Sequence, residues 1–347
     1  KGAVRFPSAA RDGTLVYGFE GEVWRKASGQ PAQRVAVQVH QGAMKHETFN
    51  VTGDGQFSEM EVSPDGSQIV VIARGEVFVV STATQTTRRI THTPVHERHA
   101  GFAPDGRSLV YISERDGDMD IFQATLGDAA MKDFTSPGQI VETKLIDTDG
   151  DLMYPKVSPD GKKLAWLADR GSIRVFDFAT RETVTPLPPG IIYSYLDEDQ
   201  SFRWSPDSRW LAATTGSVII GQDITLLDAS GKAPPMPLTR SAYSESEPRF
   251  SPDISAVLWI SEREGLREAD DKTGLVDIYM AYLTREAFDA SRTGTAGASR
   301  KLAASAVPNA KGMDHRTVRL TPFSATPVNY TLTPDGSALL FVDREAK

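Results

Sequence analysis

The 347-residue sequence predicts an all-β fold built from repeated four-stranded units. One observation is a Pro-Asp-Gly turn or a variant of it, in which Pro presets φ near −65° and Gly accepts a positive φ, so that two antiparallel strands are connected. The turn recurs at Asp12, Asp65, Asp105, Asp160, Asp207, Asp253 and Asp335. An apolar run follows each turn, and in five repeats an acid then opens a further strand. Four strands in a repeat of roughly 45 residues are typical of a blade of a β-propeller.

The apolar runs are continuous rather than alternating, which indicates strands that are covered on both faces. They comprise Leu15–Tyr17, Ile69–Ile72, Leu109–Ile112, Leu164–Leu167, Leu211–Ala213, Val257–Ile260 and Leu339–Val342. Stacking of blades around an axis covers both faces of such strands, so the runs favour the propeller.

The third and fourth strands of the blades have their own markers. The acids that open third strands are Glu22, Glu76, Asp120, Asp223 and Asp277. Fourth strands end in an apolar residue and Thr at Ile90-Thr91, Leu238-Thr239 and Leu320-Thr321.

These markers predict one propeller over residues 1–347, with about six complete blades and part of a seventh. The predicted blades cover 1–40, 57–93, 96–147, 152–188, 199–240 and 245–321, and the partial blade covers 328–347. Residues 293–311 are rich in Ala, Gly, Ser and Thr, and they are predicted to form a mobile insertion. Helix is expected only near 284–292. Because the sequence starts at Lys1 and its last repeat has only two strands, we expect a piece of a longer protein.

Two turns lack the glycine that the others place after Asp. Ser208 and Ile254 occupy that position. A β-branched residue at a positive φ costs roughly 1–2 kcal/mol or more. We therefore expect the turn of Ser251 to Ile254 to adopt a different geometry.

Composition narrows the class of function. The net charge of −8 and the pI of about 5.4 weigh against nucleic acid and anionic membranes as partners. No apolar run reaches about 18 residues, so no membrane span is predicted. The chain has no cysteine, which excludes disulfides, thiolate nucleophiles and Cys-ligated zinc.

His92, His96 and His99 cluster with Glu97 and raise the possibility of a metal site. They flank a strand end and a proline loop, whereas the His-Glu-x-x-His zinc motif requires one helical face. We interpret them as solvated loop histidines, with a metal site as the weaker alternative.

Two acidic strings resemble calcium loops, namely 116–120 and 147–151. An EF-hand loop requires Gly at its sixth position and Glu at its twelfth. The first string has Ile121 and Gly127 there, and the second has Leu152 and Ser158. Both strings are therefore interpreted as turn acids, and no metal or cofactor is predicted.

The sequence contains no recognisable catalytic machinery. A Gly-x-Ser-x-Gly elbow, a phosphate-binding Gly-rich loop and a dinucleotide fingerprint are all absent from it. The acidic run of Asp197, Glu198 and Asp199 and the mixed loop 262–271 are interpreted as solvated rim, with contact to a basic ligand as the alternative. No catalytic residue is predicted, no binding residue is assigned, and the chain itself is expected to lack hydrolase activity.

Longer strings resemble the propeller region of tricorn-type serine peptidases, against a background of repeats shared with TolB and the prolyl oligopeptidase group. The strings are Arg88–Arg98, Ser261–Glu268, Asp277–Phe288 and Arg316–Phe323. The resemblance implies a propeller that filters or channels unfolded peptides towards a PDZ-like module and a proteolytic core. None of the motifs of that core occurs in these 347 residues.

The resemblance further implies a serine-type endopeptidase as the parent, a possible homo-oligomer formed through that parent, and an exported, periplasmic location. A cytoplasmic location remains the alternative. The second class of function is a TolB-like propeller that docks a protein or a glycan without an associated peptidase. For a peptide conduit, the net negative charge predicts a mild preference for basic or neutral peptides at the axial channel.

Overall fold

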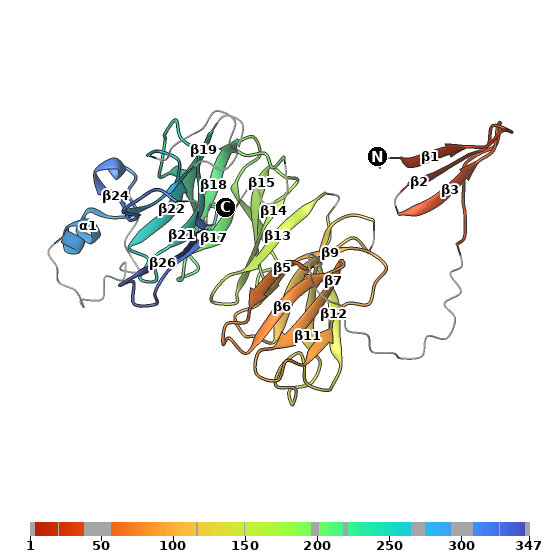
Figure 1. The fold of residues 1–347 in the computed structure, drawn as a ribbon, viewed down its shortest axis with the longest axis horizontal. Helices are drawn as coiled ribbons and strands as arrows, with labels where there is room; N and C mark the ends of the chain where they lie inside the picture. Colours follow the sequence, from red (N-terminus) through yellow and green to blue (C-terminus); the bar gives the residue numbers. More distant parts are fainter. Residues whose placement is uncertain are drawn as a thin grey trace.

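The computed structural model describes residues 4–19, 21–37, 57–115, 117–148, 150–195, 201–217, 221–264, 275–292, 308–325 and 327–343. Within these ranges the chain forms six four-stranded sheets and one two-stranded sheet. Every sheet is an antiparallel meander in which sequential strands are neighbours (Figure 1). The predicted all-β propeller of about six blades and a partial seventh is confirmed.

Each complete sheet is one blade. Blades 1 to 3 consist of β1 (Arg5–Ala9), β2 (Leu15–Phe19), β3 (Glu22–Lys26) and β4 (Gln33–Arg34); β5 (Phe57–Val62), β6 (Gln68–Ala73), β7 (Glu76–Ser81) and β8 (Thr87–Arg89); and β9 (Glu97–Phe102), β10 (Ser108–Ser113), β11 (Asp120–Leu126) and β12 (Ile140–Ile146).

Blades 4 to 6 and the partial blade 7 follow the same plan. They consist of β13 (Leu152–Val157), β14 (Lys163–Ala168), β15 (Ser172–Asp177) and β16 (Thr183–Leu187); β17 (Phe202–Trp204), β18 (Trp210–Ser217), β19 (Gly221–Asp228) and β20 (Met236–Pro237); β21 (Glu245–Phe250), β22 (Ala256–Ser261), β23 (Asp277–Tyr282) and β24 (Thr317–Arg319); and β25 (Pro327–Leu332) and β26 (Leu339–Asp343). Helix α1 (Arg285–Arg292) lies where helix was predicted, and the 3-10 turn η1 (Met313–Arg316) precedes β24. Of the insertion predicted over 293–311, residues 293–307 lie outside the described ranges. No described helix has the length and apolarity needed to cross a membrane.

The Ser-Pro-Asp-Gly turns are held by a repeated set of hydrogen bonds. In blade 2, Ser63 Oγ donates to Asp65 Oδ1 at 2.7 Å and accepts from the Gln68 N–H at 2.9 Å. Gly66 takes a φ of 73°. The Ser–Asp bond recurs at Ser158, Ser205 and Ser251, so the turn chemistry is local and repeats with the sequence.

The prediction for the turn at Ile254 was wrong. Ile254 has a φ of 63° and Ser208 has a φ of 62°, close to the φ of Gly66. Asp253 keeps the usual bond from Ser251, at 2.7 Å. The Ile254 side chain is 1% exposed, and full burial of an Ile side chain contributes about 1.5–3 kcal/mol, which offsets the backbone cost.

The apolar runs of blades 3 to 6 are buried between blades, as their continuous pattern predicted, whereas Leu15 in blade 1 and Leu340 in the partial blade 7 are exposed. In β10, Leu109 and Tyr111 belong to a core shared with blade 2, whereas Val110 and Ile112 belong to a core shared with blade 4. Further cores join blades 4 and 5, 5 and 6, and 6 and the partial blade 7. Alternate residues of one strand therefore stabilise two different interfaces.

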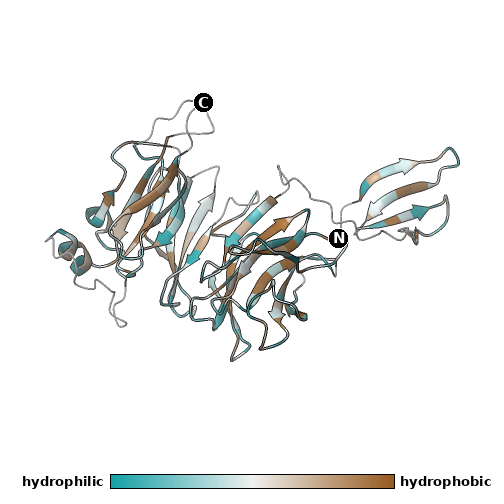
Figure 2. Ribbon diagram, turned by 60° about the horizontal axis from the view of Figure 1, so that its bottom comes forward, coloured by the Kyte–Doolittle hydropathy of each residue, from teal (hydrophilic) through white to brown (hydrophobic). Residues whose placement is uncertain are grey.

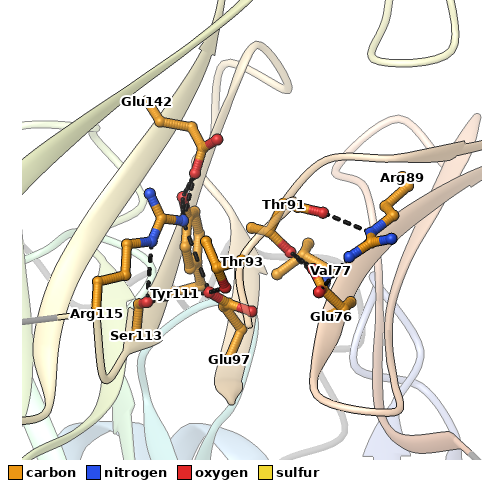
Figure 3. A network of polar contacts seen from close by, with 10 residues as sticks. All are labelled: Glu76, Val77, Arg89, Thr91, Thr93, Glu97, Tyr111, Ser113, Arg115 and Glu142. Atoms are coloured by element: carbon orange, nitrogen blue, oxygen red, sulfur yellow. Dashed lines mark hydrogen bonds and ion pairs between the residues drawn. The ribbon is translucent and has the colours of Figure 1, made fainter. Parts of the chain in front are cut away.

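The acid that opens a third strand is bound by the threonine that ends the fourth. Thr91 Oγ1 donates to Glu76 Oε2 at 2.6 Å and accepts from the Val77 N–H at 2.9 Å (Figure 3). The equivalent pairs are Thr239 with Asp223 and Thr321 with Asp277. One physical contact thus explains two sequence markers that recur together.

A second polar network links the beginning of β9 to β10 and β12 of the same blade. Glu97 is fully buried and accepts hydrogen bonds from Thr93 and Ser113, at 2.6 and 3.0 Å (Figure 3). The Arg115 guanidinium lies 3.7 Å from Glu97 and also contacts Glu142. Burial raises the pKa of the Glu97 carboxyl despite these donors.

Blade 1 lies apart from the other blades (Figures 1 and 2). Several of its apolar side chains are exposed, with Phe6 at 87% and Leu15 at 42%. In blade 2, Met60 of β5 is 77% exposed. That all seven sheets form one domain stays a prediction.

Candidate binding site in the axial cavity

The first strands of five successive blades line an open cavity of about 650 Å³. These strands are β5, β9, β13, β17 and β21, which each begin the meander of their blade. Because each strand runs into the same turn, corresponding residues can be identified by counting back from the first turn residue, such as Ser158 in blade 4.

Most of the cavity lining comes from the second and fourth residues before the turn. The second residues are Glu61, Gly101, Lys156 and Arg203, and the fourth residues are Glu59, His99, Tyr154, Ser201 and Glu247. The third residues also reach the cavity at Met60, Ala100, Pro155 and Phe202. Ala100, Phe202 and Tyr330 are buried in cores between blades, whereas Met60 is exposed.

A bulge in the inner strand positions the fourth residue. In β13 two residues, Tyr154 and Pro155, oppose one residue of β14, and Tyr154 has a φ of 54°. His99 and Glu247 adopt the same left-handed backbone in their blades. Such a conformation is uncommon for large side chains, and bulges of this kind re-aim a side chain from the sheet face. Here the re-aimed side chains line the cavity.

Contacts within the cavity link neighbouring blades. The rings of His99 and Tyr154 lie with centroids 4.1 Å apart, and the Tyr154 N–H donates to His99 Nδ1 at 3.3 Å. Glu61 accepts a hydrogen bond from the Phe102 N–H at 3.1 Å. Gly101 permits this approach, since a Cβ there would lie 3.1 Å from both Glu61 oxygens.

The cavity carries charges of both signs. Glu59 and Glu61 come from β5, Lys156 from β13, Arg203 from β17 and Glu247 from β21. Arg203 pairs with Glu247 at 3.8 Å. Burial, followed by the nearby Arg203 guanidinium, lowers the pKa of Lys156 to about 8. The arrangement provides polar donors, acceptors and aromatic rings that a bound ligand could contact.

A second, smaller cavity of about 180 Å³ lies at blades 5 and 6. Glu245 and Trp259 line it, and both are nearly fully buried. Ser241 donates to Glu245 Oε1 at 3.1 Å, while burial raises the pKa of Glu245. Its size suits one or a few waters rather than a polypeptide.

The structure separates the residues of the histidine cluster. His92 and His96 are exposed, Glu97 is buried between blades, and His99 lines the cavity. Across the described residues, no group of three or more His, Asp or Glu side chains could hold a metal ion. The interpretation of all three histidines as loop residues misplaces His99, which lies within β9.

The two acidic strings meet at one lysine. Lys144 Nζ lies 2.9 Å from Asp120 and 3.3 Å from Asp147. Asp151 lies 3.8 Å from Arg170. Asp116 and Asp149 lie outside the described residues.

The two acidic runs assigned to the rim are described only in part. Residues 197–199 and 265–271 lie outside the described ranges. Within the mixed loop, Glu264 pairs with Arg319 at 2.9 Å.

Sequence reasoning missed the cavity residues because they share a position and not a residue type. Aligning the blades on their turns, and reading the second and fourth residues before each turn, would have grouped Lys156 with Arg203 and His99 with Tyr154.

Comparison with known proteins supports the fold. Neither a family model nor a curated protein matches the chain. Among solved structures, the tricorn protease superposes with a TM-score of 0.54 at 13% identity, over 92% of this chain and 30% of that one. A putative TolB from Agrobacterium tumefaciens has a TM-score of 0.47 at 18% identity, over 65% of this chain and 77% of that one. TolB from Acinetobacter baumannii has a TM-score of 0.43 at 18% identity, over 80% and 60%.

The similarity to the tricorn protease, at this level of identity, concerns the fold alone. Together with the blades described above, it defines the chain as a β-propeller. The chain spans about 30% of the tricorn protease.

Proposed function

We propose that this chain is a non-catalytic propeller that binds extended polypeptide in its axial cavity and channels it to a proteolytic core elsewhere in a tricorn-like serine peptidase. The observation that carries the proposal is the cavity itself, which is lined by inner strands of five blades and is large enough for several residues of extended chain. Its charged, hydroxyl and aromatic groups can contact a polypeptide backbone and a range of side chains.

The resemblance in the sequence supplies the remainder of the proposal. By that resemblance, the partners of this propeller are a PDZ-like module and a serine-type core, and the location is exported and periplasmic. Each contact between the cavity and a polypeptide backbone would be weak, which suits a conduit that must release what it binds. The alternative is a docking propeller for a folded protein or a glycan, which would use the outer rim.

A reversible block of the cavity tests this proposal. Because the chain has no native cysteine, Ser201→Cys in the cavity wall can be coupled through a disulfide to a bulky thiol reagent. Ala179→Cys, on the exposed turn after β15, carries the same adduct as the matched control. The readout is fluorescence anisotropy of a labelled, unstructured peptide.

We expect the adduct at 201 to weaken peptide binding and reduction to restore it, with no change for the adduct at 179. Equal binding with and without the adduct at 201 would contradict the cavity as the binding site and favour the rim.

A further inference from the structure

Lys156 is the cavity residue whose charge has no partner. Its side chain extends from β13, directly after the bulge, and is half-buried. Among the described residues that line the cavity, Lys156 is the one charged side chain whose head group makes no hydrogen bond or ion pair. A half-buried ammonium without an acceptor loses hydration that nothing replaces.

The neighbouring charges do not provide that acceptor. Glu61 on β5 is bonded to the Phe102 N–H, and Glu247 on β21 is paired with Arg203. Glu59 on β5 and His99 on β9 have interactions of their own. These acids favour the charged form of Lys156 from a distance, whereas Arg203 on β17 opposes it.

We propose that Lys156 binds a carboxylate of the polypeptide held in the cavity, with Arg203 of the next blade as the second cation. This inference rests on the proposed function and adds the chemistry of the ligand. A carboxylate accepts several hydrogen bonds at once, and its pairing with an ammonium is charge-assisted. Lys156 and Arg203 occupy the same position on adjacent blades, so a single carboxylate can lie against both walls.

The inference runs against the preference predicted from net charge. The net charge of −8 favours basic or neutral peptides at long range, where salt screens it. Contact within a partly dehydrated cavity depends instead on the local groups. We therefore expect one acidic group to be selected at Lys156, while Glu59 and Glu61 on the opposite wall accept donors from the rest of the peptide.

Proton linkage at Lys156 makes the affinity for a carboxylate peptide depend on pH in a characteristic way. The pKa of free Lys156 is lowered to about 8, and a bound carboxylate favours the protonated amine and so raises this pKa. Binding at pH above 8 then requires uptake of a proton. Affinity for a carboxylate peptide is accordingly constant below pH 8 and falls above it, whereas affinity for a neutral peptide stays flat.

The experiment compares three labelled peptides of one Gly- and Ser-rich sequence with an acetylated N-terminus. The first has a central Glu and an amidated C-terminus, the second has Gln in place of Glu, and the third has Gln and a free C-terminal carboxylate. The Glu and free-terminus peptides distinguish the two sources of the carboxylate. The proteins are wild type, Lys156→Met, Lys156→Arg and the control Lys162→Met, whose side chain lies on the exposed turn.

We expect Lys156→Met to weaken binding of at least one carboxylate peptide about tenfold, the factor corresponding to a charge-assisted bond of about 1.4 kcal/mol. Binding of the neutral peptide should be unchanged, and Lys156→Arg and Lys162→Met should both retain the preference. In Lys156→Arg, the affinity for carboxylate peptides should no longer fall above pH 8. That result would show that the charge at position 156 matters, rather than its packing.

Equal binding of all three peptides by the wild type would overturn the assignment of Lys156 and leave the conduit standing. The same holds if Lys156→Met keeps the preference. Absence of binding of every peptide would overturn the proposed function, and the carboxylate site with it.

Discussion

Blade 1 and blade 4 have the same local structure and different surroundings. Both are four-stranded meanders whose first strand has a bulge with a left-handed residue before Pro, at Phe6 in β1 and Tyr154 in β13. Blade 4 is packed on both faces, and its second strand is almost fully buried. Blade 1 lies apart, and every residue of β1 is exposed. Turn and bulge chemistry therefore suffice to define a blade, whereas burial depends on its neighbours.

The largest difference is expected for apolar truncations. Leu164 in blade 4 is fully buried, and Leu164→Ala should lower the free energy of unfolding by about 2–5 kcal/mol. Leu15 in blade 1 is 42% exposed, and Leu15→Ala should cost less than about 1 kcal/mol. Urea unfolding followed by tryptophan fluorescence measures both. Equal costs of the two substitutions would show that blade 1 is packed within a ring.

The next largest difference in stability is expected at the acids that open third strands. Thr321 donates to the fully buried Asp277 at 2.7 Å and accepts from the Ile278 N–H, so Thr321→Val should cost about 1–3 kcal/mol. In blade 1 the corresponding acid, Glu22, is exposed and pairs with Arg34 at 3.2 Å. Glu22→Gln should change stability by less than about 0.5 kcal/mol. A substantial loss in Glu22→Gln, measured in the same urea assay, would contradict this ranking.

Much of the blade architecture follows from the sequence alone, whereas the exposure of Leu15 in blade 1 does not. The turn residues, the continuous apolar runs and the paired acid and threonine markers are local, so they predicted the blades without knowledge of their neighbours. The Ile254 turn was mispredicted because burial of its side chain depends on the tertiary structure and outweighs a local backbone cost. Lys156 and Arg203 were missed because the cavity gathers unlike residues from distant strands.

Two carboxyl groups, those of Glu97 and Asp12, should change the free energy of unfolding in opposite directions as the pH rises. Burial raises the pKa of Glu97, so the folded state holds its proton more tightly than the unfolded state, and Glu97 costs stability as pH rises above about 4.5. Hydrogen bonds from Thr14 lower the pKa of Asp12 in blade 1, so its contribution is present above about 3.8 and is lost in acid.

Urea midpoints of two variants between pH 3 and 8 measure these signs. Relative to wild type, Glu97→Gln should gain stability as pH rises above about 4.5. Relative to wild type, Asp12→Asn should lose stability as the pH rises through about 3.8. Parallel curves for wild type and Glu97→Gln would show that the buried carboxyl does not have a raised pKa.

The smallest effect is expected for two strand glycines. A Cβ at Gly101 would lie 3.1 Å from both carboxylate oxygens of Glu61, whereas the nearest atom to a Cβ at Gly18 in blade 1 is 3.5 Å away. Alanine stabilises a strand position by about 0.5–1 kcal/mol when it fits. Gly18→Ala should show that gain and Gly101→Ala should not. A larger gain in unfolding free energy for Gly101→Ala would mean that Glu61 does not lie against β9.

Photo-crosslinking most directly tests the claim that polypeptide binds on the axis. An unstructured peptide carrying a central benzophenone group is irradiated with the wild-type chain, and the modified residues are located by mass spectrometry after digestion. We expect adducts on the first strands β9, β13 and β17, with Tyr154 and its neighbours among them, and their loss in the presence of excess unlabelled peptide. Adducts confined to outer strands such as β12 and β16, or to the exposed turns, would contradict this claim.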